Sequence, residues 1–125
     1  MSEDVWIELR GLRVAARIGV TDAELEVERP LEIDIDLIPR SCAATETDAI
    51  EDTVDYSQVA AIAEGLATGK PHRTLERLAA RIAEAILATC DCAEVGVRVA
   101  KPDPPMPQPV DAVAVRVARS ADPQS

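Results

Sequence analysis

The chain has 125 residues, enough for one domain with its own core, and it carries a net charge of −10. Such an acidic chain, with one Trp, one Tyr and no Phe, lacks the basic clusters and stacking aromatics that nucleic acids require. No apolar run reaches membrane-spanning length, and the acidic start Met1-Ser2-Glu3-Asp4 is unlike a secretion signal. We therefore expect no nucleic-acid partner, no membrane association and a cytoplasmic location.

The cysteine and histidine content argues against a metal centre. Cys42, Cys90 and Cys92 form an odd set without CxxC spacing, and the only histidine, His72, lies far from them in sequence. We expect reduced thiols and no metal, with His72 exposed in a loop.

Two strands are predicted in the first third of the chain. Apolar residues alternate from Val5 to Ile18 with a one-residue slip at Arg10-Gly11, which predicts a long strand with a bulge. After an acidic connector over 19–30, alternation resumes from Leu31 to Leu37. This pattern predicts a second strand, paired antiparallel with the first.

Two helices are predicted in the middle of the chain. Ser57 is a candidate N-cap for the first, which stops at Gly69-Lys70-Pro71. Thr74 is a candidate N-cap for the second, whose apolar stripe begins at Leu75 and which should end near Cys90.

Alternating valines predict two final strands, over 95–99 and 113–117, separated by a proline-rich loop. The order β-β-α-α-β-β predicts an α+β fold, a four-stranded antiparallel sheet with two helices on one face. We expect one domain over residues 1–119 and a disordered tail over 120–125. The other face of the sheet would be exposed in a monomer, so we expect an oligomer to cover it.

Four side chains could carry chemistry, and each also has a plain structural interpretation. Glu24 can be a solvated charge of the acidic connector, and Tyr56, the only tyrosine, can anchor a loop by packing. Glu76 lies in the first turn of the second predicted helix, where a carboxylate complements the helix dipole. Lys101, one of only two lysines against eleven arginines, ends a strand. None of the four predicts a function by itself.

Their order and spacing within four short segments are more informative. These segments are Ile18-Gly19-Val20 followed by Glu24, Asp52-Thr53-Val54-Asp55-Tyr56, Leu75-Glu76-Arg77-Leu78-Ala79, and Val97-Arg98-Val99-Ala100-Lys101-Pro102 with Pro104-Pro105-Met106-Pro107. Over nearly its whole length the chain resembles the dihydroneopterin aldolase family, which has the tunnelling fold (T-fold). The resemblance implies that the sheets of several copies close into a barrel. It suggests a homo-octamer of two stacked rings whose active sites are shared between subunits.

The resemblance also implies a reaction and a role for each candidate residue. The enzyme would cleave 7,8-dihydroneopterin into 6-hydroxymethyl-7,8-dihydropterin and glycolaldehyde, a step of folate biosynthesis, by cofactor-free general acid/base catalysis. Glu76 would anchor the pterin by accepting hydrogen bonds from a ring N–H and the exocyclic amine. Lys101 and Tyr56 would transfer protons, with Glu24 tuning Lys101 and Tyr56 reaching in from the neighbouring subunit. The further substrate contacts would be Leu75, Val20, Thr21 and Asp55.

Two alternatives remain open. The first is an epimerase of dihydroneopterin or its triphosphate, for which Lys70 and Arg73 could bind phosphates. Epimerisation is also expected as a side activity of an aldolase, because cleavage and re-addition invert the 2′ carbon. The second is a non-catalytic pterin-binding oligomer, against which the joint presence of the four candidate side chains argues.

Overall fold

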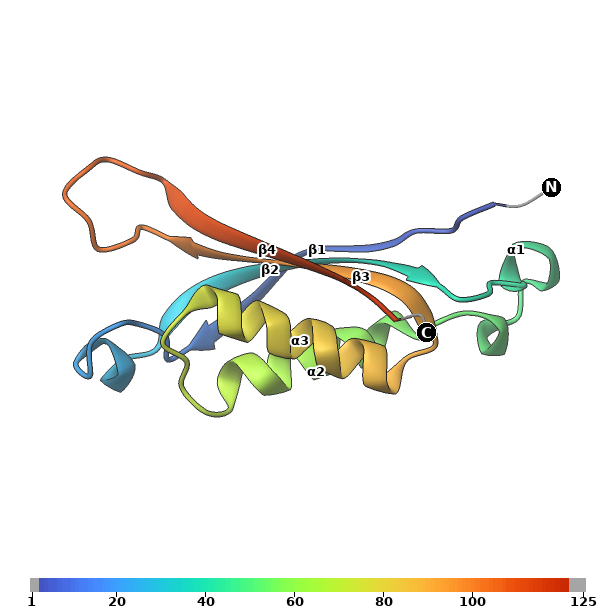
Figure 1. The fold of residues 1–125 in the computed structure, drawn as a ribbon, viewed down its shortest axis with the longest axis horizontal. Coiled ribbons are helices and arrows are strands. Elements are labelled where there is room, and N and C mark those ends of the chain that lie inside the picture. Colours follow the sequence, from blue (N-terminus) through green and yellow to red (C-terminus); the bar gives the residue numbers. More distant parts are fainter. Residues whose placement is uncertain (1–2, 122–125) are drawn as a thin grey trace.

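The computed structural model of the protein describes residues 3–121. Its four strands form one antiparallel sheet in the order β1-β2-β3-β4, with bounds β1 Ile7–Ala16, β2 Arg29–Pro39, β3 Cys92–Pro102 and β4 Ala112–Ser120. The helices α2 (Tyr56–Thr68) and α3 (Leu75–Thr89) both lie against one face of this sheet (Figure 1). This is the α+β arrangement that the sequence predicts.

The predicted bulge is present in β1. Two residues, Arg10 and Gly11, lie between the paired positions Leu9 and Leu12, which are opposite Ile35 and Ile33 of β2. Gly11 has a φ of 74°, a value that favours glycine, and its N–H donates to Asp34 Oδ1 at 2.7 Å. The bulge keeps apolar residues on both sides of it directed toward the helices.

The caps of the two long helices differ in how well the sequence predicted them. Thr74 caps α3 as predicted, its hydroxyl accepting from the N–H of Arg77 at 3.1 Å. The N-cap of α2 is Asp55, not Ser57, because the carboxylate of Asp55 accepts from the N–H of Ser57 at 2.9 Å. Asp55 has an extended backbone, and its carboxylate satisfies an N–H of the first turn, so the helix begins two residues earlier than a cap at Ser57 would allow.

The core lies between the sheet and the two helices. Its fully buried side chains alternate along β2 and β3 and repeat at helical spacing in α3: Ile33, Ile35, Leu37, Val95, Val97, Val99, Leu78, Ile82 and Ile86. The other face of the sheet carries paired charges instead. Asp36 of β2 lies 2.6 Å from Arg10 of β1 and 3.8 Å from Arg116 of β4.

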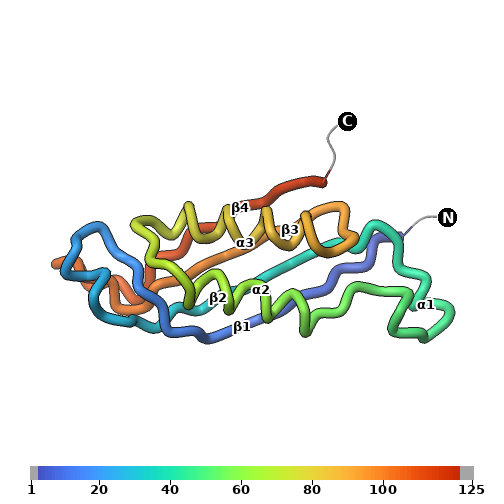
Figure 2. The backbone as a smooth tube through the Cα atoms, turned by 90° about the horizontal axis from the view of Figure 1, so that it is seen from below, coloured from blue at the N-terminus to red at the C-terminus, as the bar shows by residue number. Residues whose placement is uncertain are grey.

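The connections gather at two distant ends of the molecule, as the two views in Figures 1 and 2 agree. One end holds the β1–β2 loop with its 3-10 turn η1 (Glu24–Glu26), the α2–α3 loop and the β3–β4 loop. The other end holds the short helix α1 (Ala44–Thr47) and the 3-10 turn η2 (Ile50–Asp52), which precede α2. Residues near Glu24 and residues near Asp52 are therefore far apart within one chain.

Strand β4 extends through Ser120, the first residue of the expected tail, while residues 122–125 lie outside the described part of the chain. Among residues 3–121, no helix is both long enough and apolar enough to cross a membrane.

Candidate active site

A pocket of about 290 Å³ lies at the end of the molecule that holds the β1–β2 loop. Its polar lining includes Glu24, Glu76 and Lys101, and its apolar lining includes Val20 and Leu75. Five of the residues that the sequence singled out thus share one pocket, although they come from the β1–β2 loop, the start of α3 and the end of β3.

Glu24 is the most strongly held of these side chains. Its Oε1 atom accepts from the N–H groups of Val20 at 2.9 Å and Thr21 at 3.1 Å, and from the Thr21 hydroxyl at 3.3 Å. Its Oε2 atom lies 3.7 Å from Lys101 Nζ. The Thr21 N–H bond, followed by the charge of Lys101 and the Val20 N–H bond, holds the pKa of Glu24 below its ordinary value against the opposing effect of burial. Glu24 is therefore an anion at neutral pH.

Lys101 reaches the pocket because of its place in the strand register. In β3, Val97, Val99 and Lys101 alternate on the face that carries the helices, and Lys101 follows the last of the buried valines. The side chain of Lys101 is only 12% exposed, so its ammonium group is largely withdrawn from water beside the Glu24 carboxylate. An amine held in this way can give a proton to a bound molecule or take one from it.

Glu76 differs from Glu24 in having no fixed partner. It lies in the first turn of α3, two residues after the N-cap Thr74, and it lines the same pocket. Within residues 3–121 no hydrogen bond or ion pair engages its carboxylate. Both oxygens are therefore available to accept hydrogen bonds from a ligand.

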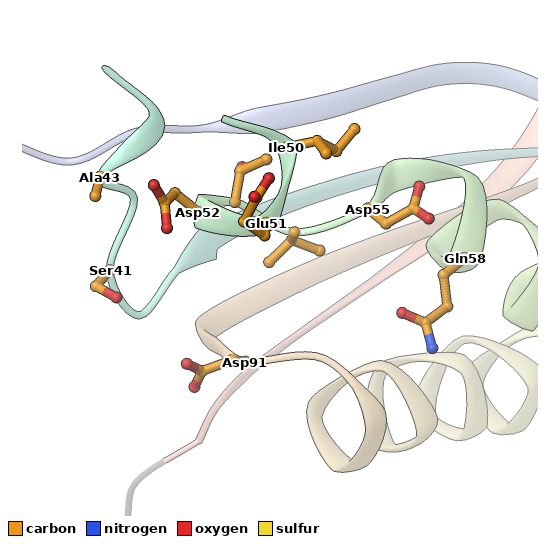
Figure 3. Close-up of a pocket in the computed structure, with 10 residues that line it drawn as sticks. Ser41, Ala43, Ile50, Glu51, Asp52, Asp55, Gln58 and Asp91 are labelled. Carbon is orange, nitrogen blue, oxygen red and sulfur yellow. The ribbon is translucent and has the colours of Figure 1, made fainter. Parts of the chain in front are cut away.

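Tyr56 and Asp55 lie at the other end of the molecule, where α2 begins. Tyr56 is 63% exposed at the start of α2, and Asp55 lines a second pocket of about 510 Å³. Figure 3 shows the carboxylates of Asp52, Asp55 and Asp91 around this second pocket, together with Ile50. The structure does not bring Tyr56 or Asp55 to the pocket of Lys101 within one chain.

His72 is buried, at 4% exposure, so the expectation of an exposed loop histidine was wrong. The backbone N–H of His72 donates to the carbonyl of Arg17, and the backbone carbonyl of His72 accepts from the N–H of Gly19, both at 3.1 Å. This isolated β-bridge, between Ile18 and His72, holds His72 beside the segment that follows β1. The Nε2 atom of the His72 ring lies 2.8 Å from Arg81 Nη1. Burial, followed by the charges of Arg81 and Lys70, lowers the pKa of His72.

The sequence analysis considered Arg73 only as a phosphate-binding candidate. In the structure its Nη1 atom donates to the Val20 carbonyl and its Nη2 atom donates to Asp22 Oδ1, both at 2.6 Å. No periodic pattern in the sequence predicts these contacts of Arg73 or the bridge of His72, because each joins single residues of two segments that are distant in sequence.

These features define a class of protein, one that binds a small molecule and carries out acid/base chemistry on it. An apolar wall, an ion pair withdrawn from water and a free carboxylate form a site that can bind a small polar molecule and move protons on it. Among residues 3–121, no group of three or more His, Cys, Asp or Glu side chains is placed to hold a metal ion.

Comparisons with known proteins identify the family. The family model described as dihydroneopterin aldolase matches residues 7–118. A dihydroneopterin aldolase of Streptomyces coelicolor is 36% identical over 114 residues, covering 91% of this chain and 96% of the relative. The chain therefore belongs to the dihydroneopterin aldolase family.

Two solved structures carry the same fold. The E. coli dihydroneopterin aldolase in complex with neopterin superposes with a TM-score of 0.85 at 26% identity, covering 93% of this chain and 99% of that one. The dihydroneopterin aldolase of Burkholderia thailandensis bound to guanine gives a TM-score of 0.78 at 27% identity, with coverages of 95% and 93%. The α+β fold of this chain is thus the T-fold of that family.

Proposed function

We propose that the protein cleaves 7,8-dihydroneopterin into 6-hydroxymethyl-7,8-dihydropterin and glycolaldehyde, a step of folate biosynthesis. The observation that carries this proposal is the pocket itself. In a chain of the dihydroneopterin aldolase family, the Lys101–Glu24 ion pair shares one pocket with the unpaired carboxylate of Glu76.

Glu76 would recognise the ring. A pterin presents a ring N–H next to an exocyclic amine, and a carboxylate can accept one hydrogen bond from each. Guanine presents the same pair of donors, and one relative is bound to guanine while another is bound to neopterin. Val20 and Leu75 would cover the ring with apolar surface, and Thr21 would support the site through its contact with Glu24.

Lys101 would act on the ring during cleavage. Loss of the 2′-hydroxyl proton lets the bond between C1′ and C2′ break, which releases glycolaldehyde. The electron pair of that bond passes into the protonated C=N of the ring and leaves an enamine. The enamine takes a proton at C1′, and the ring nitrogen gives its own proton back as the C=N forms again, which yields the hydroxymethyl product. Because the substrate accepts its own electron pair, Lys101 need form no Schiff base and no cofactor is required. Lys101 would supply the ring proton directly or through one water, while the Glu24 anion stabilises its positive charge.

Tyr56 would complete the site from a second copy of the chain. It would move protons at the 2′-hydroxyl and at C1′, with Asp55 next to it as a further substrate contact. Support comes from its place, exposed and at the end of the molecule remote from Lys101. The strands β1 and β4 are the free edges of the sheet, and pairing of such edges between copies would close a barrel. We propose a homo-octamer of two stacked rings.

The alternatives fit the pocket less well. An enzyme for the triphosphate would need free cations at the pocket. The guanidinium of Arg73 is already bonded to Val20 and Asp22, and Lys70 does not line the pocket. A protein that only binds pterin would have no need to hold Lys101 against Glu24 in a site withdrawn from water.

The product of the reaction tests this proposal. The purified protein is given 7,8-dihydroneopterin, and the pterins and glycolaldehyde are resolved over time. We expect 6-hydroxymethyl-7,8-dihydropterin and glycolaldehyde in equal amounts, with slower formation of the 2′ epimer. Formation of the epimer alone would identify an epimerase, and no turnover by the assembled protein would remove both activities.

A further inference from the structure

We propose that Arg73 is a positioning residue that holds the Val20–Thr21 peptide so that Glu24 stays in place against Lys101. This proposal rests on the function proposed above, and it assigns a part of that site to a residue outside the acid/base and ring-binding groups.

The contacts of Arg73 span two parts of the chain that meet only in the fold. Arg73 lies directly before Thr74, the N-cap of α3, and it reaches back to the β1–β2 loop. One of its amino groups donates to the carbonyl of Val20 and the other to the carboxylate of Asp22, each at 2.6 Å. We call this pair of contacts the Arg73 clasp. It grips the loop on both sides of Thr21.

The clasp and Glu24 bind the two ends of one rigid group. The carbonyl of Val20 and the N–H of Thr21 belong to the same planar peptide unit, so fixing one fixes the other. Arg73 donates to the carbonyl, while the N–H donates to Glu24 Oε1 at 3.1 Å. A donor at the carbonyl also polarises the peptide and strengthens its N–H as a donor. Arg73 therefore both orients and strengthens a hydrogen bond that holds Glu24.

The last link is the ion pair in the pocket. The second carboxylate oxygen of Glu24 lies 3.7 Å from Lys101 Nζ. The N–H bond from Thr21 is also the largest cause of the lowered pKa of Glu24, larger than the charge of Lys101. A change at Arg73 should therefore reach Lys101 through Glu24 without altering either residue.

The backbone on both sides of Arg73 is fixed, which makes the clasp specific to an arginine. Before it, His72 exchanges two backbone hydrogen bonds with Arg17 and Gly19. After it, Thr74 starts α3. From this fixed point, the planar fork of a guanidinium reaches two acceptors at once, whereas the single ammonium of a lysine cannot match that geometry.

Arg73 also lines the pocket, so a direct contact with substrate is the competing explanation. Both of its amino groups are already bonded within the protein, at 2.6 Å each. Asp22 separates the two explanations, because it takes part in the clasp, is 89% exposed and does not line the pocket.

The test compares Arg73→Ala, Arg73→Lys and Asp22→Ala with Arg77→Ala, which removes an arginine of the same helix end that takes no part in the clasp. In Arg73→Ala we expect kcat to fall by about 10-fold or more while KM stays within about 3-fold. The acid limb of the kcat profile should move to higher pH, because the Thr21 N–H bond that lowers the pKa of Glu24 is weakened. Arg73→Lys should recover part of the loss, Asp22→Ala should show a smaller change in the same direction, and Arg77→Ala should match the wild type.

A raised KM with kcat unchanged in Arg73→Ala would overturn the proposal in favour of a substrate contact, as would an unmoved acid limb. If Arg73→Ala fails to assemble, Asp22→Ala carries the same test, and a wild-type profile there overturns it. A second measurement needs no turnover: the Glu24 carboxyl carbon is titrated by NMR in the ligand-free proteins. Its pKa should rise in Arg73→Ala and Asp22→Ala but not in Arg77→Ala. An unchanged pKa contradicts the clasp even if the wild type proves inactive toward dihydroneopterin.

Discussion

Glu24 joins Lys101 to the loop that follows β1, since one of its carboxylate oxygens lies 3.7 Å from Lys101 Nζ and the other accepts two backbone N–H groups. The ion pair is thus fixed to the backbone at residues 20 and 21 and to the position of β3 that comes after its last buried valine on the same face. A site built in this way depends on a loop conformation as much as on the side chains that line it.

Replacement of Lys101 tests its assigned role in proton transfer. In Lys101→Ala we expect turnover of 7,8-dihydroneopterin to fall by at least about 100-fold, because the ring loses its proton donor. Binding of neopterin should change by less than about 3-fold, since the ring is held elsewhere. Calorimetry and the product assay measure the two effects. The other lysine, Lys70, is exposed and outside the pocket, so Lys70→Ala is the matched control. Comparable losses of binding and turnover in Lys101→Ala would show that Lys101 anchors the ring.

Replacement of Glu76 should have the reverse pattern. In Glu76→Gln one acceptor and the negative charge are lost, and a charge-assisted hydrogen bond contributes about 1.5–3 kcal/mol. We therefore expect neopterin to bind about 10- to 100-fold more weakly, as measured by calorimetry. Glu64→Gln, an exposed glutamate of α2, is the control. Wild-type affinity in Glu76→Gln would mean that another group recognises the ring.

Because Gly19 has no side chain, Glu24 can pack directly against the backbone at residue 19. A Cβ added at residue 19 would lie 2.8 Å from Glu24 Cδ and 2.9 Å from its Oε1 atom, closer than such atoms approach. Gly19→Ala should therefore displace Glu24 and lower kcat by about 10-fold or more, as the product assay would show. Gly65→Ala is the control, because a Cβ at that position of α2 meets nothing within 4 Å. Full activity in a folded Gly19→Ala protein would show that turnover does not require Glu24 in this position.

His72 makes stability depend on pH. Its pKa is lowered in the fold from an ordinary value of 6.5, so the unfolded chain binds its proton at a higher pH than the folded chain does. The contribution of the neutral His72 ring to the free energy of unfolding is therefore complete above about pH 6.5 and is lost as the pH falls below that value. The lowered pKa of Glu24 affects stability only at lower pH, because the ordinary pKa of this carboxyl group is 4.5.

Denaturant unfolding at pH 7.5 and 5.5, at one protein concentration, measures this effect. The free energy of unfolding of the wild type should fall between these values, and that of His72→Phe should fall less. An equal loss in both proteins would show that His72 is not the group that titrates.

The sequence predicted the sheet, the bulge and the cap Thr74 because each has a local pattern: alternation, a glycine slip, and a hydroxyl before an apolar stripe. It missed Asp55 as a cap because Asp55 and Ser57 are both common N-cap residue types, and the local pattern does not distinguish them. It also failed to show how the candidate site is assembled. Periodicity gives the face on which Lys101 lies but not which loop covers it, and the contacts of residues 72 and 73 depend on how two loops meet in three dimensions.

Mixing two inactive variants tests most directly the central claim, that dihydroneopterin is cleaved at a site built from two copies of the chain. Tyr56→Phe and Lys101→Ala subunits are dissociated, combined in equal amounts and reassembled, with exchange verified by mass spectrometry. If each site takes Lys101 from one copy and Tyr56 from its neighbour, random assembly restores both residues in about a quarter of the sites. We therefore predict glycolaldehyde release at about a quarter of the wild-type rate. No recovery in proven mixed assemblies would contradict the shared site, because a site within one chain can never regain both residues.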